Sequence, residues 1–221
     1  MDKKYCVFDM DGTLVDSMGY WQGMEREYLA RRGAQPGPAL EELIERLKPM
    51  TLGDAAKAFI AELGFSGTPE QIVSEMNAIM EDNYRTRVPL KPDVKDYLTA
   101  LKERGATLCT ASATVAWLVK LCLDRLGIGS LFDHMISCVD VGASKDRPDV
   151  YFAAAKRMGA QPAEVAVYED SLQALTTAKN AGFYTVAVWD KNSAADWPAL
   201  CELADESVKD WAAAAKELRG A

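Results

Sequence analysis

From residue 89 to residue 189, the chain alternates short apolar segments with longer amphipathic ones, and this pattern restricts the fold more than any other feature. The short segments predict buried β-strands, because they are rich in β-branched and aromatic residues. The longer segments carry apolar residues at helical spacing, and most of them end at a glycine. Strands that alternate with helices form right-handed βαβ units, so we expect an α/β fold with a doubly wound parallel sheet.

The sequence predicts six strands, at Tyr5–Phe8, Ala106–Ala111, Met135–Val139, Val165–Tyr168, Tyr184–Trp189 and near Ser207–Val208. The helices expected after residue 89 are Pro92–Arg104, Val115–Leu126, Asp149–Met158, Leu172–Ala181 and an Ala-rich one at the end of Asp205–Leu218.

The first strand is separated from the others by a long helical region. Residues 17–88 show no strand pattern and predict four helices, one of which begins with a capping box from Thr68 to Gln71. We therefore expect an α/β core domain, residues 1–16 and 89–221, and a helical bundle domain, residues 17–88. A helical insertion directly after the first strand is well placed to act as a lid.

Two carboxylates, Asp9 and Asp11, stand where the first strand should end. The carboxyl ends of strands are the ligand-binding edge of an open α/β sheet. Carboxylates this close repel each other unless a cation joins them or one is protonated, and Mg²⁺ is a suitable cation. A calcium-binding EF-hand is excluded, because its required Gly and Glu positions hold Leu14 and Tyr20. An ordinary Asp-rich turn is the remaining alternative.

Further polar residues stand at or near the ends of later strands. A hydroxyl beside main-chain amides can donate to phosphate oxygens, and a lysine can offset charge on them. Acidic residues that end a buried strand need a cation or hydrogen bonds. Each of these residues taken alone could be an ordinary turn or surface residue. The positions are Thr110, Ala111, Ser112, Lys145, Glu169 and Asp170.

The segment from Asp9 to Ser17 resembles the first motif of the haloacid dehalogenase (HAD) superfamily. Thr110, Lys145 and the Glu169–Asp170 pair resemble its second, third and fourth motifs, in the family's order. Asp146, which follows the lysine, departs from the proline of many members. The resemblance implies an α/β core with an α-helical cap. The family's dehalogenase branch lacks the second Asp, so Asp11 indicates phosphoryl transfer.

The resemblance extends to the phosphatase and β-phosphoglucomutase-like branch, and it implies a Mg²⁺-dependent phosphatase acting on a small phosphate monoester. Asp9 would form an aspartyl-phosphate and Asp11 would be the general acid and base. Thr110 and Lys145 would complete the catalytic set. Substrate binding would involve Thr110, Ala111, Ser112 and Lys145. The metal ligands would be Asp9, the main-chain carbonyl of Asp11, Asp170 and Glu169, the last directly or through water.

Other functions remain open beside this one. The β-phosphoglucomutase branch has a cap His and Arg where this chain holds Trp21 and Leu52, so hydrolysis is favoured over mutase transfer. A phosphonate hydrolase would use a cap lysine, but Lys48 and Lys57 are better interpreted as exposed helix residues. A non-catalytic binding protein on the same scaffold is a third alternative. Candidate residues for choosing the leaving group are Trp21, Gln22, Lys48, Met50 and Thr51.

Composition excludes several classes of function. The 221 residues carry a net charge of -8 and no basic patch, so we expect no nucleic-acid partner. We also expect no membrane span and no signal peptide. The five cysteines are scattered and form no CxxC pair; most lie in apolar segments and indicate core residues, and together they indicate a reducing cytoplasm. His134 is the only histidine, which rules out multi-histidine metal sites, and we assign it a connector role. Nothing in the sequence requires more than a monomer.

Overall fold

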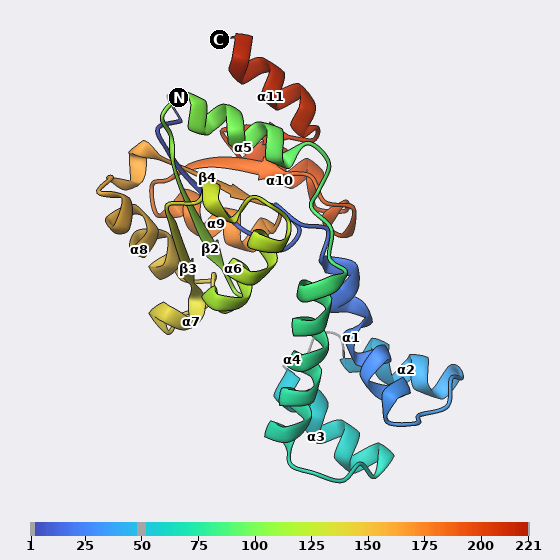
Figure 1. The fold of residues 1–221 in the computed structure, drawn as a ribbon. Coiled ribbons are helices and arrows are strands. Elements are labelled where there is room, and N and C mark those ends of the chain that lie inside the picture. The colour runs from blue at the N-terminus through green and yellow to red at the C-terminus, as the bar shows by residue number, and fades with distance from the viewer. Residues whose placement is uncertain (1–2, 48–51, 221) are drawn as a thin grey trace. The chain divides into compact units, whose positions relative to one another are not determined.

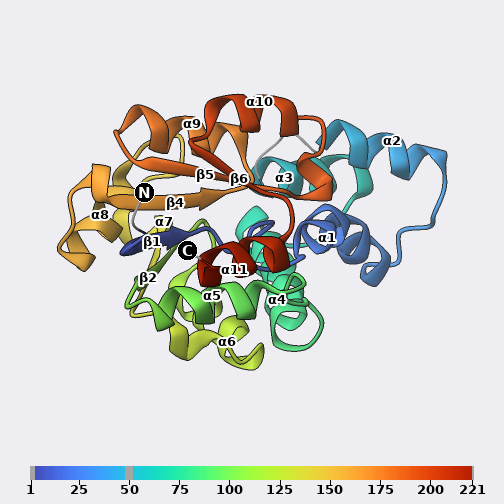
Figure 2. The same ribbon diagram turned by 90° about the horizontal axis from the view of Figure 1, so that it is seen from above.

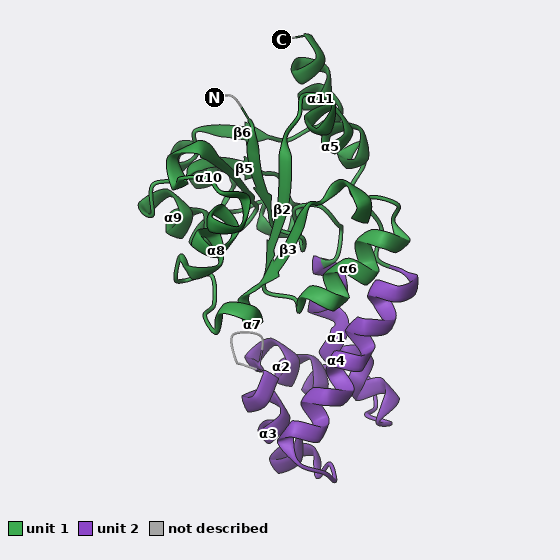
Figure 3. Cartoon of the chain, turned by 60° about the vertical axis from the view of Figure 1, so that its left-hand side comes forward, with its two compact units in different colours: residues 1–17, 88–221 green, residues 18–87 purple. Residues whose placement is uncertain are grey.

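The structure, a computed structural model, describes residues 3–47 and 52–220. The chain divides into two compact units (Figure 3). One unit combines the N-terminal segment through Ser17 with the chain from Val88 onwards, and the other is Met18–Arg87. Within the described ranges, the search for a helix with the length and apolar character of a membrane span finds none.

The larger unit is built on one parallel sheet, as predicted (Figure 1). Its strands are β1 (Tyr5–Phe8), β2 (Thr107–Ser112), β3 (His134–Ser137), β4 (Val165–Glu169), β5 (Tyr184–Val188) and β6 (Glu206–Val208). Their order in the sheet is β3-β2-β1-β4-β5-β6, and every neighbouring pair is parallel. The order places β1 between β2 and β4. Phe8 of β1 is level with Thr110 on one side and with Tyr168 on the other.

Helices cover both faces of this sheet, which confirms the doubly wound fold (Figure 2). On one face lie α5 (Val94–Glu103), α6 (Ala116–Arg125) and α11 (Trp211–Gly220). On the other lie α8 (Asp149–Met158), α9 (Leu172–Asn180) and α10 (Trp197–Leu203). Shorter helical turns are α7 (Cys138–Val141) and the 3₁₀ segments Gly129–Leu131, Pro162–Glu164 and Lys191–Ser193.

Aromatic side chains hold the central strands together. Phe8 stacks on Tyr168 with ring centroids 4.2 Å apart, and Tyr168 also contacts Tyr97 of α5 and Trp211 of α11. The phenolic oxygens of Tyr97 and Tyr168 are 2.7 Å apart, so these buried hydroxyls satisfy each other. Burying each such ring contributes about 1.5–3 kcal/mol. This packing fixes the ends of β1 and β4 next to each other.

The smaller unit contains the four expected helices. They are α1 (Met18–Arg31), α2 (Pro38–Leu47), α3 (Leu52–Leu63) and α4 (Pro69–Thr86). The predicted capping box at the start of α4 is confirmed, because Thr68 and Gln71 exchange side-chain to main-chain hydrogen bonds. The core of this unit includes Tyr28, whose ring packs against Phe59 and Phe65.

The larger unit closes on itself where the helical segment is inserted. The main-chain N–H of Asp16 donates to the carbonyl of Pro89 at 3.0 Å. The N–H of Lys91 donates to the carbonyl of Leu14, also at 3.0 Å. The chain therefore leaves and re-enters this unit through two hydrogen-bonded segments, residues 14–16 and 89–91.

Some predicted boundaries are wrong. The strand predicted at Met135–Val139 ends at Ser137, because Ser137 and Asp140 form a capping box that starts α7. The helix α10 was not predicted. Four of the five cysteines are buried, which agrees with their assignment as core residues, and Cys201 is exposed.

Candidate active site

The turn after β1 holds the first two predicted site residues. Asp9 directly follows the strand, and its main-chain N–H donates to the carbonyl of Tyr168 at 3.0 Å. Asp11 precedes Gly12, whose φ of 80° is a left-handed conformation that glycine adopts readily. A Cβ at Gly12 would overlap the Asp170 carboxylate, so glycine is required for this turn to lie against that residue.

Two hydroxyl groups orient the Asp11 carboxylate. Ser17 Oγ donates to Asp11 Oδ1 at 2.6 Å, and Thr114 Oγ1 donates to Asp11 Oδ2 at 2.8 Å. Asp11 is half-buried, whereas Asp9 is only 8% exposed. The two carboxylates of one turn therefore lie in different environments, which suits them to different chemical roles.

Lys145 supplies a fixed positive charge beside Asp9. Its ammonium lies 2.5 Å from Asp9 Oδ1 and 2.6 Å from Glu169 Oε1. Tyr151 of α8 donates to the same Glu169 oxygen at 2.8 Å. Burial lowers the pKa of Lys145, but the two carboxylates more than offset this, and its pKa is raised above the ordinary value. Lys145 is thus a largely buried, charged residue, with a side chain 13% exposed, and not a solvated surface lysine.

Three acidic residues form one cluster at the ends of β1 and β4. Asp9, Glu169 and Asp170 each offer a carboxylate oxygen, and these oxygens lie within 4.8 Å of one another. Burial raises the pKa of Glu169 to about 8 and that of Asp170 to about 7. Burial also raises the pKa of Asp9. In the absence of a cation, this cluster therefore retains protons near neutral pH.

The cluster fits a hard divalent cation. Asp170 accepts hydrogen bonds from Thr13 Oγ1 at 3.0 Å and from Ser193 Oγ at 3.3 Å. Glu169 Oε2, in contrast, is buried and has no hydrogen-bond partner among the residues that the structure describes. A buried carboxylate oxygen without a partner is costly, and carboxylate oxygens are the ligands that Mg²⁺ prefers.

The predicted phosphate-binding segment lies within β2 and not after it, because the strand continues to Ser112. Thr110 Oγ1 is buried and has no hydrogen-bond partner in the described part of the chain. Ala111 packs in the hydrophobic core on the other face of the sheet, so it can offer only its main chain. Ser112 Oγ accepts from the main-chain N–H of Thr114 at 3.0 Å, which fixes the following turn.

Sequence reasoning missed most of the hydroxyl groups that orient the acidic residues. Ser17 lies inside the segment that resembles the family motif, and that position was its only signal. Thr114 gave no signal, because it lies 103 residues from its partner Asp11. Among the described residues, side chains that donate to the site carboxylates without having been predicted include Ser17, Thr114, Tyr151 and Ser193. Thr13, which donates to Asp170, follows Gly12 and was expected to add a hydroxyl beside the carboxylates.

Two of the residues considered for leaving-group choice can be placed within the helical unit. Trp21 is half-buried, and its Nε1–H donates to Tyr84 at 2.9 Å. Gln22 is exposed. The other candidates, Lys48, Met50 and Thr51, lie outside the described residues.

Comparison with known proteins gives one family and several enzymes. The sequence model of the haloacid dehalogenase-like hydrolases matches residues 3–182. Hexitol phosphatase B of Escherichia coli (strain K12) is 27% identical over 192 residues, which cover 82% of each chain. A mitochondrial (DL)-glycerol-3-phosphatase 1 of Arabidopsis thaliana is 28% identical over 210 residues, 91% of this chain and 68% of that protein.

Solved structures share the fold. A structure from Thermotoga maritima, provisionally named as a β-phosphoglucomutase, superposes with a TM-score of 0.80 at 22% identity, over 98% of this chain and 99% of that one. A HAD family hydrolase from Deinococcus radiodurans R1, with bound phosphate and sodium, gives a TM-score of 0.70 at 24% identity, over 99% and 97%. At these identities, the likeness establishes the architecture alone.

Proposed function

Because the chain belongs to the haloacid dehalogenase-like hydrolase family, we propose that it is a Mg²⁺-dependent phosphatase that acts on a small phosphate monoester. The observation that carries this proposal is the pair of carboxylates in the turn after β1. Asp9 lies against the Lys145 ammonium, whereas Asp11 is held by two hydroxyl groups. This arrangement supplies one nucleophile and one separate general acid and base.

In the first step, a carboxylate oxygen of Asp9 attacks phosphorus in line with the leaving oxygen. The new bond joins Asp9 to phosphorus, and the bond from phosphorus to the alcohol oxygen breaks. Lys145 offsets the negative charge beside the nucleophile, and the partnerless Thr110 hydroxyl donates to a phosphoryl oxygen. Asp11 gives its proton to the departing alcohol.

In the second step, water cleaves the aspartyl-phosphate. Asp11, now ionised, takes a proton from the water as its oxygen bonds to phosphorus. The bond from Asp9 to phosphorus breaks, which returns the carboxylate and releases inorganic phosphate. Ser17 and Thr114 keep the Asp11 carboxylate in one orientation through both transfers.

The proposed metal ligands are Asp9, Glu169, Asp170 and the main-chain carbonyl of Asp11. When bound there, Mg²⁺ would neutralise charge on the phosphoryl oxygens. We assign Glu169 a direct or water-mediated role on the ground of its partnerless buried oxygen.

The two relatives described above are named for phosphate esters of polyols, a hexitol and glycerol. We therefore propose a phosphorylated polyol or sugar as the substrate class. The negative charge of the protein makes a compact ester with one phosphate more suitable than a multiply charged substrate.

The test is phosphate release from a panel of esters, with Mg²⁺ and with a chelator. The panel contains glycerol 3-phosphate, hexitol phosphates, phosphoglycolate, β-glucose 1-phosphate and a nucleoside monophosphate. We expect Mg²⁺-dependent release that is greatest for a polyol or sugar phosphate. Conversion of β-glucose 1-phosphate to the 6-phosphate without net release would instead indicate a mutase. No turnover of any ester would favour a binding protein.

A further inference from the structure

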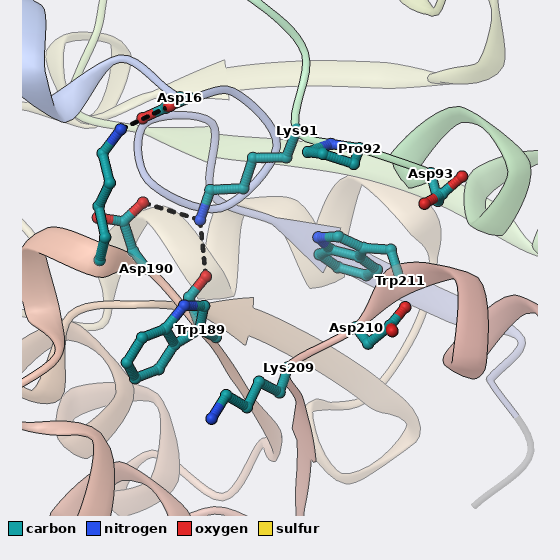
Figure 4. Close-up of a pocket in the computed structure, with 10 residues that line it drawn as sticks. Asp16, Lys91, Pro92, Asp93, Trp189, Asp190, Lys209, Asp210 and Trp211 are labelled. Atoms are coloured by element: carbon teal, nitrogen blue, oxygen red, sulfur yellow. Dashed lines mark hydrogen bonds and ion pairs between the residues drawn. The ribbon is translucent and has the colours of Figure 1, made fainter.

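Lys91 is a buried cation that the proposed chemistry does not use. It lies just before α5, is 9% exposed, and its ammonium contacts three acceptors, of which Figure 4 shows two, Asp190 and Trp189. These are the Asp190 carboxylate at 2.9 Å, the main-chain carbonyl of Trp189 at 2.7 Å, and the main-chain carbonyl of Gly12. An ammonium has three N–H donors, so all of its donors have partners.

The contact with Gly12 connects this cation to the turn that holds the carboxylates. Gly12 directly follows Asp11, and its Cα lies against the Asp170 carboxylate. The main-chain N–H of Lys91 also donates to Leu14, so one residue binds this turn through both its main chain and its side chain. Lys91 in this way links the turn after β1 to Trp189, which directly follows β5.

The backbone after Lys91 has an unusual conformation. Pro92 follows, and then Asp93, which has the only positive φ, 60°, among non-glycine residues of the described chain. Asp tolerates this left-handed conformation better than most residues. Lys91 lines a cavity of about 340 Å³ together with Trp189 and Trp211.

We propose that Lys91 is a positioning residue, which holds the Asp9–Gly12 turn in its reactive geometry through the Gly12 carbonyl. The proposal builds on the phosphatase function above. The competing explanation is that Lys91 serves only to pair with Asp190. Removing one member of a buried ion pair is destabilising, because it leaves an unpaired charge, whereas removing both need not be. This difference separates the two explanations.

The experiment is a cycle of Lys91→Met, Asp190→Asn and the double variant. Methionine keeps an unbranched side chain that is one atom shorter than that of lysine and has no charge. We expect Lys91→Met to lower the melting temperature by on the order of 10 °C. The double variant has the wild-type net charge and should recover most of that loss.

Activity should not follow stability in this cycle. Asp190→Asn keeps the contact between Lys91 and Gly12, so its kcat should stay within about threefold of wild type. Lys91→Met and the double variant should each lose about 10²-fold in kcat, the cost of a displacement of about 1 Å, with KM little changed. If kcat recovers together with stability in the double variant, Lys91 has a structural role only and the proposal is overturned.

Hydrogen–deuterium exchange makes the result independent of the proposed activity. The main-chain amides of residues 10–14 should exchange at least about tenfold faster in the double variant than in wild type or Asp190→Asn, because their turn has lost a contact. Unchanged exchange would overturn the proposal even in a protein without phosphatase activity. A wild-type protein that turns over no ester, with the expected exchange pattern, would overturn only the function proposed above.

Discussion

At the scale of single residues, Asp9 and Asp11 are two positions apart and have different partners. Asp9→Asn keeps the shape of the side chain but removes the nucleophile, so turnover should fall below detection. Asp11→Asn removes the general acid and base and should lower kcat by about 10²–10⁴-fold. Phosphate release under saturating substrate measures both.

Circular dichroism and thermal unfolding of these two variants provide the control for folding. Asp124→Asn, which alters an exposed carboxylate paired with Lys120, is the matched change of charge away from the site. It should leave kcat within about twofold of wild type. Substantial turnover by a folded Asp9→Asn protein would contradict the assignment of the nucleophile.

Thr110 allows the role of one hydroxyl to be separated from stability. Its Oγ1 has no hydrogen-bond partner among residues 3–47 and 52–220, so Thr110→Val should not lower the melting temperature. Loss of a donor to the phosphoryl oxygens should lower kcat by roughly 10²-fold. The matched control is Thr185→Val, also buried, whose hydroxyl donates to Asp205 at 2.9 Å.

Thr185→Val should show the reverse behaviour, a loss of about 1 kcal/mol in stability with kcat unchanged. Chemical unfolding and steady-state kinetics on the two variants measure both quantities. A Thr110→Val enzyme with wild-type kcat would remove Thr110 from the catalytic set.

At the scale of elements, the turn after β1 depends on Gly12. Gly12→Ala would place a methyl group against the Asp170 carboxylate, in a backbone conformation that alanine rarely adopts. Gly159→Ala has the same kind of strain, with φ of 71°, but meets no atom within 4 Å. Gly159→Ala should lose about 1–2 kcal/mol in stability, and Gly12→Ala should lose more because of the added contact with Asp170. Only Gly12→Ala should also weaken Mg²⁺ binding, by at least tenfold.

Titration calorimetry with Mg²⁺ and urea unfolding of the two glycine variants measure these effects. Equal Mg²⁺ affinity in Gly12→Ala and Gly159→Ala would mean that the turn does not control the acidic cluster. It would also argue against Asp170 as a metal ligand.

Much of the fold could be predicted, because strands and helices of this chain are locally consistent. Apolar strand segments, glycine stops and the capping box at Thr68 are short-range signals, and the parallel sheet followed from their alternation. The end of the third strand was missed, because Ser137 and Asp140 start a helix inside an apolar segment. Strand order is a long-range property, which the local pattern does not contain.

The acidic cluster could be predicted for a related reason. Asp9 directly follows β1, and Glu169 is the last residue of β4. These two strands are neighbours in the sheet, so the carboxylates lie close together. Thr114 and Lys91 could not be predicted, because their partners lie far along the chain and their own surroundings are ordinary. The contacts of such residues depend on how distant loops pack together in the folded chain.

At the scale of the whole molecule, the buried carboxylates link stability to pH. The pKa of Glu169 is about 8 and that of Asp170 about 7, well above their ordinary values of 4.5 and 3.8. At pH values between the ordinary and the raised pKa of each group, the metal-free folded protein binds more protons than the unfolded chain. Its stability should therefore be greatest below pH 4 as far as these groups are concerned, and should fall as pH rises to about 8.

Mg²⁺ should reverse this trend, since it binds the ionised carboxylates and competes with their protons. Melting temperatures from pH 5.5 to 8.5, with Mg²⁺ and with chelator, measure the effect. The stabilisation by Mg²⁺ should increase with pH, and Glu169→Gln should reduce this increase. A stabilisation that is independent of pH would show that the cation does not bind at these carboxylates.

The hydrogen-bonded pairing of residues 14–16 with residues 89–91 bears on how such enzymes diversify. The two ends of the inserted segment are held together by hydrogen bonds within the larger unit. A change in the length of the insertion therefore adds little to the entropic cost of closing this loop. A lineage can therefore lengthen, shorten or exchange the inserted helices by a single genetic event at this junction. The carboxylates of the sheet would be inherited unchanged, and new substrates could be explored while the chemistry stays the same.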